Sequence, residues 1–62
     1  MEDWEPIATA PYGRNLQLSV IEGGGEVSAL IFPCRRAPNG WINAQNGVPV
    51  PVDPTHWRDW QN

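Results

Sequence analysis

The sequence predicts a small all-β domain, and three observations lead to this fold class. Seven prolines and six glycines are spread over 62 residues, so no long stretch suits an amphipathic helix. Apolar and polar residues alternate at positions 15–21, which is the period of a half-buried strand. The Glu22-Gly23-Gly24-Gly25 segment that follows supplies the glycines that hairpin turns require. We therefore expect a single domain with an antiparallel meander of three or four short strands and irregular ends.

The first predicted hairpin joins residues 15–21 to residues 26–32. A loop of two or four residues pairs Ile21 with Glu26, and a three-residue loop is rejected because it would place Ser28 or Glu26 among the leucines. The expected register gathers six apolar residues on one face: Leu16, Leu18, Val20, Val27, Ala29 and Ile31. The opposite face then contains Leu30 and Phe32. Three elements are candidates to cover them, namely the segment around Trp4, the C-terminal tryptophans or another subunit.

Turn signals divide the middle of the chain. We expect a loop at residues 33–38, a turn at Asn39-Gly40, a short third strand at residues 41–43 and another turn at Asn46-Gly47. A curled, SH3-like sheet is one arrangement that such short strands adopt.

Residues 48–52 alternate valine with proline. In an extended conformation both prolines present the same edge, so the segment can pair only along its valine edge, and this blunts a sheet edge against further pairing. A polyproline-type ligand strip is the alternative.

Residues 53–60 allow two structures. Asp53 as the N-cap and Pro54 at the first helical position would begin a short helix with Trp57 and Trp60 on one face. A short closing strand at residues 55–57 is the alternative, favoured by the β-propensities of threonine and tryptophan.

Composition excludes several classes of function. Cys34 is the only cysteine, so no internal disulfide is possible, and with His56 it is too small a ligand set for a structural zinc; we expect no metal and no cofactor. The net charge of −3, with four arginines and no lysine, argues against nucleic acid as a partner. No apolar run approaches the roughly 20 residues of a membrane span, so no membrane partner is expected. The start, Met1-Glu2-Asp3, is the reverse of a signal peptide's basic region, which predicts a cytoplasmic protein.

Two residues carry reactive groups. His56 is a candidate general base or ligand, although a hydrogen-bonded structural histidine is the simpler interpretation. Cys34 precedes Arg35 and Arg36, whose charge can activate a thiol, but no resolving cysteine accompanies it, and a half-covered loop cysteine is expected. Because no nucleophile is spaced to form a triad with His56, the chain is not expected to be an enzyme.

Four tryptophans in so short a chain must close the fold or present a surface. We expect Trp4, Trp41 and Trp57 to be structural and Trp60 to be peripheral. The alternative is an exposed patch of Trp57 and Trp60, the residue type enriched in binding hot spots.

The motifs at the two ends resemble a family of small bacterial and phage-encoded proteins of unknown function. Members open on W-x-P-I-x-T-A-P and close on P-T-H-W, matched here by residues 4–11 and 54–57, with Gly40-Trp41 between them. Tyr12 replaces the polar residue expected before the glycine turn, the acid of that turn is missing, and the tail Arg58-Asp59-Trp60 departs from the family's proline-rich run. The resemblance implies a compact β fold whose two ends come together, and it implies no activity.

The expected function is a non-enzymatic accessory or protein-interaction module that binds a protein partner or itself, and the resemblance implies a phage-related origin. The candidate binding residues are Trp57, Trp60, Phe32, Leu30 and His56. A small ligand-binding or catalytic protein centred on His56 is the alternative.

Overall fold

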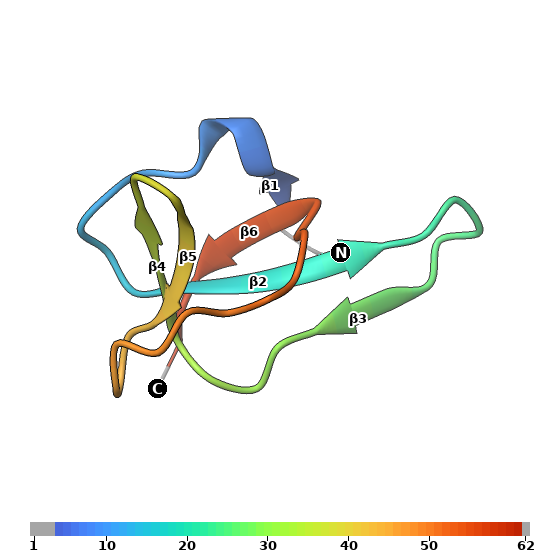
Figure 1. Cartoon of the computed structure of the whole chain (residues 1–62). Coiled ribbons are helices and arrows are strands. Elements are labelled where there is room, and N and C mark those ends of the chain that lie inside the picture. Colours follow the sequence, from blue (N-terminus) through green and yellow to red (C-terminus); the bar gives the residue numbers. More distant parts are fainter. Residues whose placement is uncertain (1–3, 62) are drawn as a thin grey trace.

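One open antiparallel sheet of six strands forms the molecule in the computed structural model, which describes residues 4–61 (Figure 1). The strands are β1 (Glu5–Pro6), β2 (Leu16–Ile21), β3 (Val27–Ala29), β4 (Cys34–Ala37), β5 (Gly40–Asn43) and β6 (His56–Asp59). A single 3-10 turn, η1 (Ile7–Thr9), is the only helical element in this part of the chain. The all-β prediction is confirmed, with more strands than the three or four expected. Met1, Glu2 and Asp3, on which the predicted localisation depends, lie outside the described residues.

Strand β2 is the centre of the sheet. One of its edges pairs with β6, from Leu16 opposite Asp59 to Ser19 opposite His56. Its other edge is shared: Leu16 pairs with Cys34 of β4, and β3 pairs with the far half of β2. The predicted strand is confirmed, and Leu16 and Leu18 of its apolar face are fully buried. The predicted alternation holds only in part, because Ser19 of the polar face is also buried and Val20 is only half-buried.

The predicted register of the β2–β3 hairpin is wrong by one residue. Ile21 pairs with Val27 and not with Glu26. The loop therefore consists of the three glycines at positions 23–25, which is the loop length rejected above. The Glu22 N–H donates to the Glu26 carbonyl (2.9 Å) and the Gly25 N–H donates to the Glu22 carbonyl (2.8 Å). Gly25 has φ +87°, a left-handed conformation that glycine adopts without steric cost and that a three-residue hairpin loop requires at this position.

The shifted register reverses the two faces of residues 27–32. Leu30 and Phe32 pack against the core, whereas Val27 is 43% exposed and Ile31 is 88% exposed. Residues of the same chain therefore pack against Leu30 and Phe32, which are both half-buried. The strand also ends early, at Ala29, because the chain bends at residues 31–32 before Cys34 pairs with Leu16.

Residues 34–37 form strand β4, although a loop was predicted there. Arg35 pairs with Ile42 and Arg36 with Trp41, and the two-residue loop Pro38-Asn39 connects β4 to β5. Pro33 precedes the strand and Pro38 follows it, so neither proline interrupts the pairing.

The valine–proline segment lies along the outer edge of β5, as predicted. The Val50 N–H donates to the Trp41 carbonyl (2.9 Å), and the Val48 carbonyl accepts from the Asn43 N–H (2.8 Å). Ile42 forms a bridge with Pro49, which has no N–H to offer on its outer side. The blunted-edge interpretation is confirmed.

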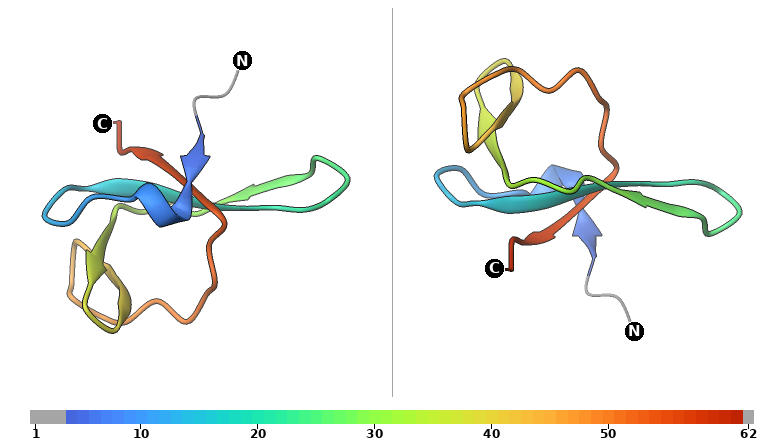
Figure 2. Two further views of the ribbon diagram at one scale, coloured as in Figure 1. Left: turned by 90° about the horizontal axis from the view of Figure 1, so that it is seen from above. Right: turned by 90° about the horizontal axis from the view of Figure 1, so that it is seen from below.

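The two end segments lie side by side. Residues 56–59 form the closing strand, so the helical alternative is wrong, and Glu5 and Pro6 of β1 pair with Trp57 and His56. The ends are therefore less irregular than predicted. Figure 2 shows that β1 lies on one side of β2, and that the β4–β5 hairpin and the segment leading to β6 lie on the other.

The core is small. Ala10, Leu16, Leu18 and Cys34 are buried, and six partly buried residues pack against them: Ile7, Leu30, Phe32, Trp41, Val50 and Trp57. Ser19 is also buried, at 1% exposure, and its hydroxyl has no hydrogen-bond partner among the described residues.

Candidate functional site

Three of the predicted binding residues belong to the packing of the core. Leu30, Phe32 and Trp57 all contact the buried cluster. The Trp57 Nε1–H donates to the Thr9 hydroxyl at 3.0 Å, which ties β6 to the η1 turn. These three half-buried residues therefore contribute to holding the fold together.

The other tryptophans are also half-buried. Trp41 packs against the core, as expected of a structural residue. Trp4 lies outside the core cluster, with the Arg58 guanidinium 4.2 Å from the centroid of its ring. The main-chain N–H of Trp60 donates to the Asn15 carbonyl (3.1 Å). Because neither Trp57 nor Trp60 is exposed, the two do not form the exposed aromatic patch considered above.

His56 is half-buried at the start of β6, between Pro6 of β1 and Ser19 of β2. Its Nδ1 lies 2.8 Å from the Thr55 hydroxyl, which itself accepts a hydrogen bond from the Ile21 N–H at 2.9 Å. These contacts place the imidazole in a network that joins β6 to β2, as expected of a structural histidine.

Cys34 is not the half-covered loop cysteine that was expected. It lies in β4 and is fully buried opposite Leu16. Burial raises the pKa of its thiol to about 11, so the thiol stays protonated near neutral pH and the adjacent arginines do not activate it. No group of three or more His, Cys, Asp or Glu side chains within residues 4–61 could hold a metal ion.

The outer edge of β3 is the first surface that the sequence argument missed. Of the described strands, β3 pairs with β2 alone, and the hairpin they form extends away from the rest of the sheet (Figure 1). The other two edges of the sheet carry proline, at Pro6 in β1 and at Pro49 beside β5. Residues 26–31 contain neither proline nor lysine, the residues that commonly protect an edge. This absence was visible in the sequence, but the incorrect register placed Val27 and Ile31 in the core.

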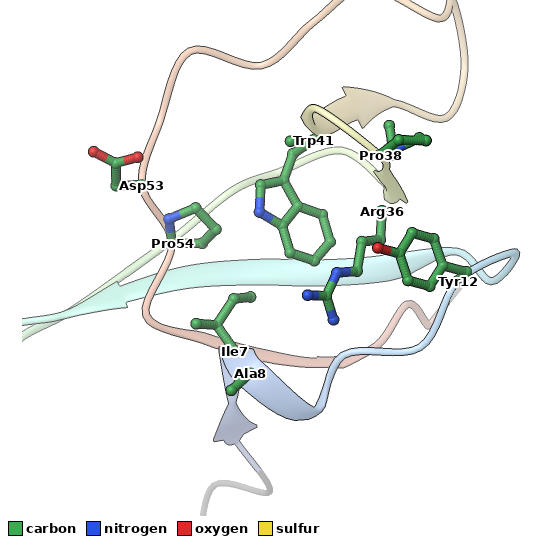
Figure 3. Close-up of a pocket in the computed structure, with 10 residues that line it drawn as sticks. Ile7, Ala8, Tyr12, Arg36, Pro38, Trp41, Asp53 and Pro54 are labelled. Carbon is green, nitrogen blue, oxygen red and sulfur yellow. The ribbon is translucent and has the colours of Figure 1, made fainter.

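A hollow of about 290 Å³ is the second such surface, and it lies between the η1 turn, the β4–β5 hairpin and the start of the closing segment. Figure 3 shows the Arg36 side chain between the rings of Tyr12 and Trp41, with Asp53 and Pro54 beyond Trp41. The Arg36 guanidinium lies 5.0 Å from the centroid of the Tyr12 ring and 5.9 Å from that of the Trp41 ring. Its Nη1 donates to the Ala10 carbonyl at 2.6 Å, which fixes its orientation.

Partial signals for this hollow were visible among the residues that line it. Tyr12 stood out as a departure from the resembling family, and Arg36 belongs to the only pair of adjacent basic residues. Nothing in their spacing showed that they meet, because residues 12, 36 and 41 come together only through the pairing of β4 with β5 and the path of the N-terminal loop.

Comparisons with protein-family models, with curated proteins and with solved structures found no match to this chain. Within residues 4–61, no helix has the length and apolar character needed to cross a membrane.

Proposed function

We propose that this chain is a non-enzymatic protein-interaction module that binds an extended segment of a partner protein along the outer edge of β3. The observation that carries the proposal is the open outer edge of this strand, which carries neither proline nor lysine. The other two edges of the sheet carry proline, at Pro6 in β1 and at Pro49 beside β5. Proline lacks the backbone N–H that an added strand would need.

The backbone groups that face this edge follow from the hydrogen bonds of the hairpin. Glu22 bonds to Glu26 at one end and Leu18 bonds to Leu30 at the other (both 2.9 Å), so these pairs face inward. Because bonded and non-bonded pairs alternate in an antiparallel ladder, Ser28 also faces β2, while Val27 and Ala29 direct their N–H and C=O groups outward. An added strand would satisfy these outward groups.

The side chains and charges around the edge define the partner. Val27 is 43% exposed, and Ile31, which follows at the bend, is 88% exposed, so the partner strand should carry apolar residues at alternate positions. Glu22 and Glu26 are both exposed at the tip of the hairpin. Charge complementarity with these carboxylates calls for lysine or arginine at the corresponding end of the partner strand.

The alternative function, catalysis or ligand binding at His56, has less support. His56 does not line the hollow beside Tyr12 and Trp41, and the buried thiol of Cys34 is not available as a nucleophile.

The test uses the blocked peptide Ac-Arg-Val-Thr-Val-Thr-Val-NH2 and amide hydrogen exchange followed by NMR. We expect the peptide to slow exchange at Val27 and Ala29 at least tenfold and to leave the already bonded Ser28 amide nearly unchanged. A matched peptide with proline in place of both threonines should have no such effect. Unchanged exchange at Val27 and Ala29 with the first peptide at millimolar concentration would refute the proposal.

Two proline variants provide the control. Ala29→Pro removes an N–H that faces outward, so the variant should fold and fail to bind the peptide. Ser28→Pro removes an N–H bonded to β2 and should destabilise the hairpin itself. Should Ala29→Pro fail to fold, Val27→Glu tests the same edge by placing a third carboxylate beside Glu22 and Glu26. If the protection of the Val27 and Ala29 amides rises with protein concentration in the absence of peptide, the strand that binds this edge belongs to a second copy of this chain and not to a foreign partner.

A further inference from the structure

The hollow beside Tyr12 and Trp41 contains a half-buried cation without a counterion. Within residues 4–61, the ion pair between Arg14 and Asp59 is the only salt bridge, and Arg36 has no carboxylate partner in this range. Asp53 lines the same hollow but does not pair with Arg36. The guanidinium of Arg36 therefore keeps N–H donors that no carboxylate of the described residues occupies.

The remaining donors of Arg36 are free to bind and are held in place. The guanidinium lies over the rings of Tyr12 and Trp41, which accept no hydrogen bond from its N–H groups here, and the bond to the Ala10 carbonyl uses one of its five N–H groups. The other N–H groups lie at the edges of the plane, where they can donate two parallel bonds to one carboxylate. Because the guanidinium is already fixed, binding an anion costs little additional side-chain entropy.

The surroundings of Arg36 favour a carboxylate over a phosphate. Asp53 places a negative charge in the same hollow, and the whole chain carries −3, so a doubly charged anion meets more repulsion than a singly charged one. Ile7, Pro54 and the Trp41 ring form an apolar wall beside the cation. At about 290 Å³ the hollow is at the lower limit of ligand pockets, so it suits one or two side chains.

We propose that this hollow binds a short acidic segment of a partner protein, with an Asp or Glu carboxylate on Arg36 and the neighbouring aliphatic side chain against Ile7, Pro54 and Trp41. This site is distinct from the edge of β3, and its failure in a test would leave the proposed strand addition unaffected.

The test compares two blocked peptides, Ac-Pro-Leu-Glu-NH2 and Ac-Pro-Leu-Gln-NH2, by NMR titration of the labelled protein. The Glu peptide should shift the Trp41 indole N–H and the Arg36 Nε–H in a saturable manner, and it should bind about three- to tenfold more tightly than the Gln peptide. Equal affinities, or no saturable shift at millimolar concentration, would overturn the proposal. Larger shifts of these two groups with inorganic phosphate than with the Glu peptide would overturn the choice of a carboxylate.

Adjacent arginines provide the matched control. Arg36→Gln should abolish the preference for Glu over Gln, whereas Arg35→Gln should retain it, because Arg35 is absent from the hollow and bonds to Asn15. Loss of the preference in both variants would contradict a specific site. If Arg36→Gln fails to fold, Asp53→Asn tests the same site. Removing the negative charge of Asp53 should increase the affinity for the Glu peptide about twofold. A lower affinity would count against the site.

Discussion

Replacing the buried Ser19 with alanine should stabilise the protein. Ser19 lies in the middle of β2 at 1% exposure, and its Oγ has no hydrogen-bond partner among the described residues. A buried polar group left without a bond costs about 1–3 kcal/mol, and this cost disappears with the hydroxyl. The void left by one oxygen atom forfeits only a few contacts of about 0.1–0.2 kcal/mol each. We therefore expect Ser19→Ala to raise the free energy of unfolding by about 1 kcal/mol.

This change should be easy to measure, because the total stability of a 62-residue domain is small. At about 0.05–0.15 kcal/mol per residue, the whole fold is stable by roughly 3–9 kcal/mol, and a gain of 1 kcal/mol raises Tm by about 4–8 °C. Urea unfolding followed by tryptophan fluorescence gives the free energy, and thermal unfolding gives the Tm.

The matched control is Ser28→Ala, on the exposed strand that pairs with β2, where the change should stay within about 0.5 kcal/mol. If Ser19→Ala instead lowered stability by more than about 0.5 kcal/mol, the hydroxyl would have a bonding partner, and the reasoning from its isolation would be refuted.

Two further predictions concern the thiol and the glycine loop. Burial raises the pKa of Cys34 from 9.0 to about 11, so between these pH values the folded state keeps a proton that the unfolded state loses. The free energy of unfolding should therefore fall by about 2 kcal/mol as pH rises through this window. Urea unfolding at pH 8 and 11 measures this fall, and the Cys34→Ala variant should lack it. The same pH dependence in both proteins would contradict the burial of the thiol. Gly25→Ala should lower the free energy of unfolding by about 1–2 kcal/mol, because Gly25 has φ +87°. Gly24 has no positive φ, so Gly24→Ala should be nearly neutral. Equal losses of stability in urea unfolding would refute the assigned loop.

The elements that could be predicted are those whose local sequence allows one arrangement. The alternation around Leu16 and Leu18 defines a half-buried strand regardless of its neighbours. Pro49 cannot donate to a ladder, so the valine edge of its segment was the only one available for pairing. Both conclusions depend on backbone and side-chain chemistry within a few residues.

The elements that could not be predicted depend on contacts distant in sequence. Counting apolar residues on one face selected Val27 and Ile31 for the core, but Leu30 and Phe32 occupy it because a positive-φ glycine permits a three-residue loop. The same one-residue error concealed the open edge of β3. Strand β4 was missed because nothing in its own sequence indicates a strand, and it is extended because it pairs with β5.

The three partners of β2 also govern how quickly the chain can fold. The hairpins β2–β3 and β4–β5 close over loops of two or three residues, but the bond from Arg58 to Gln17 joins positions 41 residues apart, and the bond from Ile21 to Thr55 spans 34. The entropy of closing the larger loop is lost before the β2–β6 contacts stabilise it, so we expect the hairpins to form first and the joining of β6 to β2 to limit the folding rate. Substitutions at that seam should then slow folding, while substitutions at contacts made later should mainly speed unfolding.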